Sequence, residues 1–484
     1  KEKLPGLKEI FSFDEQAGPR SWTALLVVEG SDFSAVEAIR NTIQADDLAT
    51  LIYTSGTTGD PKGVMLSHRN IVFNVEAMRR LIPMDPGDRV LSFLPVSHVY
   101  ERAAIYAFTA YGGSVSFSTP DSLGGDDGDL KNIRPHFFTT VPRLLEKVFE
   151  RIQNKGNELS GLKRWLFFRA LALADEWDLD KKFSGWKAFE WFIVQKLVFS
   201  KWREALGNHV KGITTAASAC PLRVLRAFNA AGIPVREGYG LTEAAPALSF
   251  NGFGAGEPSW LGTVGPALEG VTLRIVEDPA YRPGEGEIIA KSPGVMKGYY
   301  KQPEKTAEMI RNIDGEPWLV TGDIGMLVPG PLGALYLKIT DRKKELLKTS
   351  GGKYVAPTPI ESIFKEHYLV EQAMVVGENR KFVSALLVVS EQGLRNWCSK
   401  HQVPWNGVTD AIKNPAVINR YNMLVDRVNP HFGHAEQVRK FTLLSKVWEP
   451  VSKDGTDSEL TPTLKLKRRV ILKKFEKEIE ELYD

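Results

Sequence analysis

In the first half of the chain, short continuous apolar runs are followed by segments in which apolar residues recur at helical spacing. Short apolar runs, such as Ala49 to Tyr53 and His136 to Val141, predict buried strands, and we expect a further strand over Trp22 to Val28. Between such runs, His68 to Ile82 carries apolar side chains three and four residues apart, which predicts a helix. Strands that alternate with helices favour an α/β fold with a largely parallel, doubly wound sheet.

The pattern changes in the second half of the chain. Between residues 262 and 340, short strands of period two lie between glycine and proline turns and predict a small β-barrel-like subdomain. The charged stretch at 340–349 is typical of a hinge or linker, and a small α+β pattern follows it. We therefore expect a large N-terminal domain over residues 1–342 and a small C-terminal α+β domain over 343–484.

Tryptophan gathers in one segment, Leu159 to Leu206, which holds five of the eleven in the chain. Its apolar residues include one helical stripe: Trp186, Phe189, Ile193 and Leu197. The simplest interpretation is a pair of amphipathic helices packed on the core. A wall for an apolar substrate and an interfacial surface for membrane lipid remain open as alternatives.

Composition narrows the class of protein. The chain has 484 residues, 43% hydrophobic and 25% charged, which is ordinary for a globular protein of two or more domains. A net charge of +3 gives no argument for a nucleic-acid partner. Two cysteines provide no disulfide framework, and no apolar run of about 18 residues is present. We expect a cytoplasmic protein, with peripheral contact on the inner face of a membrane left open.

The most informative stretch follows the strand that ends at Tyr53. It supplies hydroxyls, glycines and a lysine, which together can hold a polyphosphate. It is not a Walker A loop, because Pro61 stands where that motif needs glycine. The run instead resembles the phosphate loop of the adenylate-forming superfamily. The resemblance assigns nucleotide phosphates to Thr54, Ser55, Gly56, Thr57, Thr58, Gly59 and Lys62.

A second motif, at residues 238–243, also resembles that superfamily. The resemblance implies that the Tyr239 ring stacks on adenine, that Thr242 contacts the α-phosphate and that Glu243 holds Mg²⁺. Upstream, the family usually carries a glycine-richer segment that lines adenine, whereas this chain has alanine and serine. The further nucleotide-binding residues assigned in this way are Ala217, Ser218, Gly238 and Gly240.

Further motifs follow the order of the family. By resemblance, Asp323 and Arg342 contact the ribose, because a carboxylate accepts hydrogen bonds from two hydroxyls. Lys344 corresponds to the hinge about which the C-terminal domain swings. His98 corresponds to the residue between the nucleotide and acyl sites, and we count it with Thr242 and Glu243 among the catalytic candidates.

Near the C-terminus, Thr461-Pro462-Thr463-Leu464-Lys465-Leu466-Lys467 resembles the segment that carries the catalytic lysine, here Lys465. A carboxylate that attacks an α-phosphate brings two anions together, so a compact cation at that point lowers the barrier. Most family members have glycine before this lysine. Leu464 in its place resembles the long-chain fatty acid–CoA ligase branch.

The resemblance covers roughly residues 46 to 475. It implies a ligase that uses ATP, Mg²⁺ and CoA. A fatty carboxylate becomes an acyl-adenylate, and the acyl group then passes to CoA with release of AMP and pyrophosphate. Family members usually have well over a hundred residues before the phosphate loop, and we expect that part to be missing from this sequence.

Several alternatives stay open at this point. A fatty acyl-AMP ligase that loads a carrier protein, or a medium-chain or aryl-CoA ligase, would share the same motifs. A non-catalytic nucleotide- or lipid-binding relative would not need Lys465. A metal site at His431 and His434 is disfavoured, because two histidines fall short of the usual three or four ligands. Acyl chain length and oligomeric state are not determined by the sequence.

Overall fold

The computed structural model describes residues 6–14, 20–26, 32–54, 61–125, 127–254, 256–278, 281–450, 457–461 and 465–484. The chain packs as two separate units, residues 1–47 and residues 48–484. The candidate chemistry lies in the second unit.

The described residues of the first unit form two short strands, a 3₁₀ turn and one helix. Strands β1 (Phe11–Ser12) and β2 (Arg20–Ser21) pair in parallel, and α1 spans Ser34–Thr42. The strand that we predicted over Trp22 to Val28 is wrong at its start, because Trp22–Leu25 forms a 3₁₀ turn. The Ser21 hydroxyl accepts a hydrogen bond from the backbone of Thr23 and so begins this turn. Residues 27 and 28 lie outside the described residues.

A six-stranded sheet forms the centre of the second unit, in the order β10-β9-β8-β7-β5-β6. All neighbours pair in parallel except β10, which is antiparallel to β9. The predicted parallel α/β core is therefore confirmed. Its strands are β5 (Arg89–Ser92), β6 (Ser114–Phe117), β7 (Phe137–Thr140), β8 (Gly212–Thr215), β9 (Val235–Gly240) and β10 (Ala247–Phe250).

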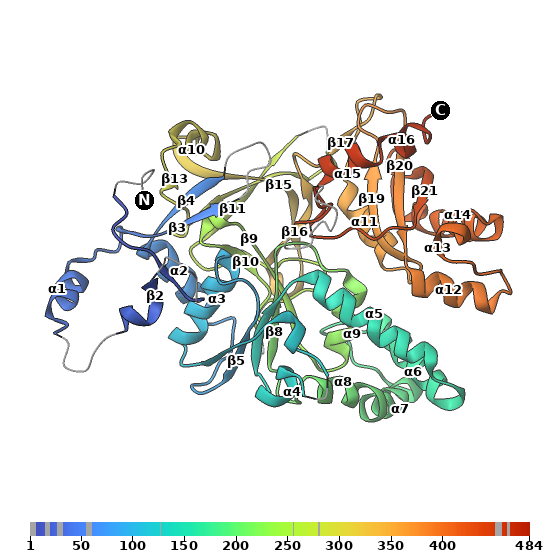
Figure 1. The fold of residues 1–484 in the computed structure, drawn as a ribbon, viewed down its shortest axis with the longest axis horizontal. Coiled ribbons are helices and arrows are strands. Elements are labelled where there is room, and N and C mark those ends of the chain that lie inside the picture. The colour runs from blue at the N-terminus through green and yellow to red at the C-terminus, as the bar shows by residue number, and fades with distance from the viewer. Residues whose placement is uncertain are drawn as a thin grey trace. The chain divides into compact units, whose positions relative to one another are not determined.

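Helices cover both faces of this sheet (Figure 1). Successive strand residues point to opposite faces, so Val90 and Phe137 pack on one side while Leu91 and Phe138 pack on the other. This explains why the strands are continuous apolar runs. On the first side lie α2 (His68–Met78) and α3 (Val99–Ala110), and on the second lie α5 (Pro142–Glu158), α6 (Gly161–Glu176) and α9 (Leu222–Ala230).

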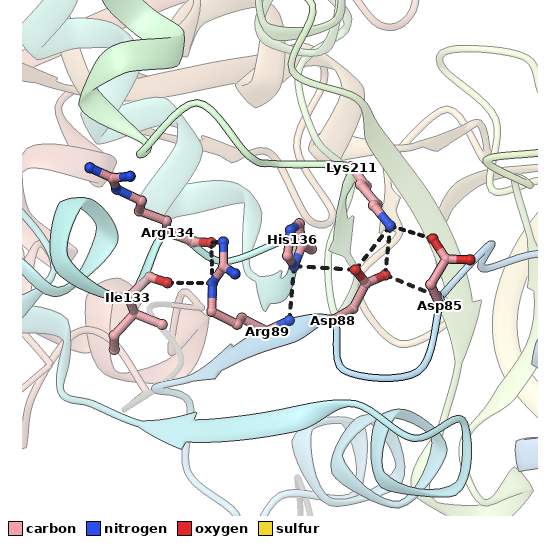
Figure 2. A network of polar contacts seen from close by, with 7 residues as sticks. All are labelled: Asp85, Asp88, Arg89, Ile133, Arg134, His136 and Lys211. Atoms are coloured by element: carbon pink, nitrogen blue, oxygen red, sulfur yellow. Dashed lines mark hydrogen bonds and ion pairs between the residues drawn. The ribbon is translucent and has the colours of Figure 1, made fainter.

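A polar network joins the amino ends of three central strands (Figure 2). The Lys211 ammonium contacts Asp85 at 2.7 Å and Asp88 at 2.9 Å. The backbone N–H of Arg89 donates to Nδ1 of His136 at 2.9 Å. Because Asp88, His136 and Lys211 each stand just before β5, β7 or β8, these contacts hold the strand starts together. The opposite, carboxyl edge is left for the candidate site.

Two smaller sheets complete the large part of the second unit. The first is β3 (Leu48–Thr54), β4 (Lys62–Ser67) and β13 (Gly298–Tyr299), in which β3 and β4 form an antiparallel hairpin. The second is the antiparallel subdomain predicted at 262–340. It contains β11 (Thr272–Glu277), β12 (Gly286–Lys291), β14 (Ile310–Ile313), β15 (Glu316–Pro329) and β16 (Leu335–Arg342).

The C-terminal part is a small α+β layer built on three strands in the order β19-β20-β21. Val375 packs with the helices on one face of this sheet, and its neighbour Met374 packs with the C-terminal helices on the other. The strands are β19 (Val370–Val376), β20 (Val383–Val389) and β21 (Val438–Leu444). The helices are α11 (Pro357–Lys365), α12 (Glu391–Lys400), α14 (Pro415–Val428), α15 (Arg468–Lys474) and α16 (Glu476–Glu480).

The half-buried His367 predicts a pH dependence for this C-terminal part. Its Nδ1 accepts the N–H of Leu369 at 3.3 Å, and its Nε2 lies 3.1 Å from the Arg420 guanidinium. Burial, with the charge of Arg420 as second cause, lowers the pKa of His367 to about 4. Because the unfolded chain binds this proton more readily, stability should fall as pH drops from about 6.5 to about 4, by at most about 3 kcal/mol.

Urea unfolding at several pH values checks this dependence. His367→Gln keeps a hydrogen-bond acceptor but cannot titrate, so its stability should fall less steeply over that pH window. His401→Gln replaces an exposed histidine and is the matched control. The same slope in wild type and His367→Gln would contradict the assignment.

Candidate active site

A cavity of about 1110 Å³ opens at the carboxyl edge of the central sheet. Of the predicted residues that the structure describes, Ser218 alone does not line it. Ser55, Gly56, Thr57, Thr58 and Gly59 lie outside the described residues. The predicted residues that line the cavity are Thr54, Lys62, His98, Ala217, Gly238, Tyr239, Gly240, Thr242, Glu243, Asp323, Arg342, Lys344 and Lys465.

The β3–β4 hairpin places one cation of the site. Thr54 and Lys62 are paired across its end, so both ends of the loop between them reach the cavity. The Lys62 ammonium lies 4.9 Å from the ring centre of Tyr299, whose hydroxyl donates to Glu243 Oε1 at 2.6 Å. Tyr299 thus connects a cation and a carboxylate. The sequence prediction missed Tyr299, because no motif marks the short strand that carries it.

The antiparallel pair β15–β16 places the next group. Asp323 and Arg342 are cross-strand partners, and Arg342 Nε lies 3.2 Å from Asp323 Oδ1. The Tyr239 hydroxyl donates to Asp323 Oδ2 at 2.7 Å. Burial raises the pKa of Asp323, and the positive charge of Arg342 opposes that rise. Each oxygen of this carboxylate keeps further acceptor capacity, which suits a vicinal diol.

Backbone requirements explain the small residues around Tyr239. A Cβ at Gly240 would lie 1.9 Å from the carbonyl oxygen of Pro246, and one at Gly238 would lie 2.7 Å from the Phe250 ring. Ala217 adopts φ of 78°, a region that glycine occupies at little cost and that costs other residues roughly 1–2 kcal/mol. This positive φ explains why glycine is favourable at this position.

His98 stands where α3 begins. Its Nδ1 accepts the backbone N–H of Tyr100 at 3.4 Å, so the ring caps the helix. The His98 ring lines the cavity. Its partial burial lowers its pKa, and the positive charge of Lys465 lowers it further. A neutral imidazole is therefore favoured at this point. Thr242 also lines the cavity, at the start of the 3₁₀ turn Thr242–Ala244.

Lys465 reaches the cavity from the C-terminal part of the chain. Its backbone N–H donates to the Thr461 hydroxyl at 3.0 Å, and its carbonyl accepts from the backbone of Thr461 at 2.8 Å. Residues 462–464 of this motif lie outside the described residues. Burial, with Arg342 as the second cause, lowers the pKa of Lys465 to about 8. Desolvation of this kind is expected at a site that is prepared for an anion.

A buried ion pair holds the chain just after Lys465. The Arg468 guanidinium makes two 2.8 Å bonds to the carboxylate of Glu361 on α11, and it lies 3.4 Å from Glu345. Asp341, at the end of β16, accepts from the backbone and hydroxyl of Thr358 at the start of the same helix. The sequence prediction did not single out any of these contacts. Lys344 lies in the exposed turn between β16 and Glu345.

The other half of the cavity is apolar. Its walls come from α2, α3 and β10, and include Val75, Met78, Ala103, Ala107 and Phe250. Ala103 and Ala107 of α3 line the cavity and leave room that larger side chains would fill. The total volume exceeds the roughly 300–1,000 Å³ of most small-molecule pockets. The cavity can therefore hold a polar, anionic group and a sizeable apolar group together.

The alternative metal site is not supported. Among the residues that the structure describes, no three histidine, cysteine, aspartate or glutamate side chains gather in an arrangement that could hold a metal ion. His431 and His434 thus lack a third ligand there. A cation bound with phosphate oxygens needs fewer protein ligands, and Glu243 fits that case.

Comparison with known proteins places this arrangement in a family. Residues 8–300 match the family described as AMP-binding enzyme, and residues 344–484 match its C-terminal domain. Long-chain-fatty-acid–CoA ligase FadD15 of Mycobacterium bovis is 32% identical over 99% of this chain and 77% of its own length. Long-chain-fatty-acid–CoA ligase 5 of Rattus norvegicus is 32% identical over 100% of this chain and 70% of its own length.

Solved structures agree on the fold. The adenylation domain of a carboxylate reductase from Mycobacterium chelonae superposes with a TM-score of 0.64 at 24% identity, over 91% of this chain and 60% of that one. O-succinylbenzoate coenzyme A synthetase from Bacillus subtilis, in complex with AMP, gives 0.59 at 22% identity, over 88% and 69%. At these identities the likeness concerns the fold alone.

Proposed function

Because this chain belongs to the AMP-binding enzyme family and matches long-chain-fatty-acid–CoA ligases along nearly all of its length, we propose that it activates a long-chain fatty acid with ATP and transfers the acyl group to CoA. One observation carries the assignment to this cavity. Lys465 shares it with the Tyr239–Asp323–Arg342 cluster and with the apolar walls of α2 and α3. A cation thus lies where a nucleotide and an acyl carboxylate would meet.

In the first half-reaction, a carboxylate oxygen attacks the α-phosphorus of ATP, and the bond to pyrophosphate breaks. We assign the β- and γ-phosphates to Lys62 and the loop before it, and the ribose hydroxyls to Asp323 and Arg342. Thr242 donates to the α-phosphate. The Lys465 ammonium stabilises the charge that develops on the α-phosphate oxygens, which a preformed cation does without reorganisation.

The site also fits a magnesium ion bound with the phosphates. Glu243 faces the cavity, and its carboxylate is oriented by the Tyr299 hydroxyl. When bound, Mg²⁺ supplies charge neutralisation on the phosphate oxygens. His98 lines the cavity near Lys465, and we assign it the position between the nucleotide and the acyl group.

In the second half-reaction, the CoA sulfur attacks the acyl carbonyl, AMP leaves with the bonding electrons, and the thiol proton passes to solvent or a base. Lys465 has no role in this step. We propose that residues 343–484 then turn about Lys344 as one domain and remove Lys465 from the cavity. Lys344 suits a hinge because it lies in an exposed turn between β16 and the C-terminal part.

A chain-length series tests the reaction class and the substrate together. ATP–pyrophosphate exchange should be driven by carboxylates of increasing length, with long chains favoured by about 0.8 kcal/mol per buried methylene. Acyl-CoA should then accumulate with CoA present. Acyl-AMP that accumulates while CoA stays unused would instead indicate a fatty acyl-AMP ligase. Exchange with no carboxylate dependence would reject the proposal.

Two variants on α3 test the assignment of the acyl group. Ala103→Phe fills the apolar half of the cavity, so activity with long acids should fall by about tenfold while short acids are retained. Ala110→Phe makes the same change at an exposed position of the same helix and should leave the series unchanged. Equal profiles for both variants would place the acyl chain elsewhere.

The pKa of Lys465 predicts a pH limb for adenylation. The reaction needs the charged ammonium, and a pKa of about 8 in the free site means that this charge is lost near pH 8 rather than above pH 10. Hence kcat/KM for adenylation should decline above about pH 8. In Lys465→Arg, whose side chain stays charged, kcat/KM for adenylation should not decline above about pH 8. The same limb in both enzymes would assign it to another group.

The hinge has its own test. Lys344→Pro restricts the backbone of the turn, so thioester formation from added acyl-AMP should slow by about tenfold or more while adenylation is spared. Lys344→Ala removes the same side chain without this restriction and should retain both half-reactions. An unchanged second step in Lys344→Pro would reject Lys344 as the hinge.

We also propose a reducing, cytoplasmic location with peripheral membrane contact. Cys220 and Cys398 are both free and buried. No helix among the described residues is long and apolar enough to cross a membrane.

A further inference from the structure

Helix α7 (Gly185–Val194) leaves three large apolar side chains exposed: Trp186, Phe189 and Phe192. We expected the stripe of Trp186, Phe189, Ile193 and Leu197 to pack on the core, but only Val194 of this helix is buried. The Trp186 side chain is 72% exposed and that of Phe192 is 64% exposed. Core packing is therefore wrong for Trp186, Phe189 and Leu197, whereas Val194 does lie in the core.

The charges of α7 explain how the helix is held. Helix α7 carries two charged residues, Lys187 and Glu190, and both pair with α6. Lys187 Nζ lies 2.6 Å from Glu176, and Glu190 accepts a hydrogen bond from Arg169 Nε at 3.0 Å. The polar side of α7 is thus turned toward α6, and its outward side is apolar. Figure 1 shows this helix pair at the outer edge of the large domain.

Helix α6, which is ion-paired with α7, also has exposed apolar side chains. Leu162 and Trp165 near its start are exposed, Trp165 by 57%. We define the α6–α7 aromatic surface as Leu162, Trp165, Trp186, Phe189, Phe192 and Leu197. Large exposed apolar patches on a folded protein usually mark an interaction site.

Positive charge accompanies this surface. Lys163 and Lys196 are sequence neighbours of Leu162 and Leu197, and Lys182 lies in the connection between the two helices. All three are exposed, and none makes an ion pair with any residue that the structure describes. Cations of this kind beside exposed tryptophan and phenylalanine complement a negatively charged lipid headgroup layer.

We propose that the α6–α7 aromatic surface binds the surface of an anionic lipid bilayer. Tryptophan and phenylalanine favour the boundary between headgroups and acyl chains, and lysine reaches the headgroups from there. A protein partner is less well matched, because lysine is depleted in protein interfaces. The helix pair lies on the bilayer and does not cross it.

This surface would provide the peripheral membrane contact proposed above. Its biological use rests on the proposed function, the activation of a long-chain fatty acid. A long-chain fatty acid partitions into lipid, so an enzyme held at the bilayer works where its substrate is concentrated. Binding to lipid, however, needs no catalysis. The proposed lipid binding and the proposed enzymatic function can therefore be rejected independently.

Co-flotation of the whole chain with vesicles tests the proposal. Wild-type protein should float with phosphatidylcholine vesicles that contain phosphatidylglycerol, and Trp186→Ala/Phe189→Ala should partition about 100-fold less. Phe117→Ala removes a phenylalanine that is 67% exposed on β6 and serves as the matched control. Lys182→Glu/Lys196→Glu should lose the preference for anionic over neutral vesicles.

The outcomes separate the alternatives. ATP–pyrophosphate exchange with a short, water-soluble carboxylate should be unchanged in the Trp186→Ala/Phe189→Ala variant, which shows that it is folded and that loss of flotation is local. Equal flotation of this variant and Phe117→Ala would overturn the proposal. The proposal would also be overturned if the variant sedimented as a monomer and the wild type as a dimer while vesicle binding stayed the same. The surface would then join two copies of this chain.

Discussion

Replacement of Lys465 by alanine is expected to slow acyl-adenylate formation by about 10²–10³-fold or more, the loss that follows removal of a transition-state donor. Lys465 is a cation that the C-terminal part brings into the cavity, and two contacts with Thr461 fix its backbone there. Thioester formation from added acyl-AMP and CoA should largely survive, because no phosphoryl charge develops in that step. Hydrolysis of acyl-AMP should also change little.

Single-turnover assays of each half-reaction measure this difference. ATP–pyrophosphate exchange reports the first, and acyl-CoA formed from synthetic acyl-AMP reports the second. Lys473→Ala removes an exposed lysine from the same C-terminal helical region and should leave both unchanged. Equal losses in both half-reactions of Lys465→Ala would show that Lys465 is not specific to adenylation.

Glu361→Ala should produce the largest loss of stability among these variants. It leaves the Arg468 guanidinium buried without the two 2.8 Å bonds that now balance its charge. Loss of one partner from a buried pair typically costs about 3–5 kcal/mol. Adenylation should fall as well, because Arg468 anchors the segment that begins at Lys465.

Denaturant unfolding and a double variant separate these two effects. Glu361→Leu/Arg468→Met replaces the pair with apolar side chains, so it should recover most of the lost stability. If the pair also positions Lys465, the double variant should still show a reduced kcat for adenylation with little change in KM for ATP. Stability and kcat that recover together would leave the pair a purely structural role.

Much of the fold was predictable because its signals are local. Continuous apolar runs such as β7 mark strands covered on both faces, and helical spacing marks α2. The strand predicted over Trp22 to Val28 failed because apolar content cannot show that the Ser21 hydroxyl starts a 3₁₀ turn. The boundary between the two predicted domains remains a prediction.

The candidate site was predictable to the extent that its residues belong to motifs. Gly240 is required by the close carbonyl of Pro246, and Asp323 and Arg342 are paired by strand register. Tyr299, which orients Glu243, belongs to no recognisable motif, so it could not be predicted from the sequence.

By itself the sequence determined the order of strands and helices, the family and the residue types available for chemistry, because these depend on local periodicity and on motif spacing. The motifs implied a shared site for Lys465 and Asp323 only through resemblance, and the tertiary structure brings these residues, 142 positions apart, into one cavity. It also decided that Arg468 pairs with Glu361 and that Trp186 faces outward. Which side chains are brought together or left uncovered depends on the packing of distant elements, and no local pattern carries that information.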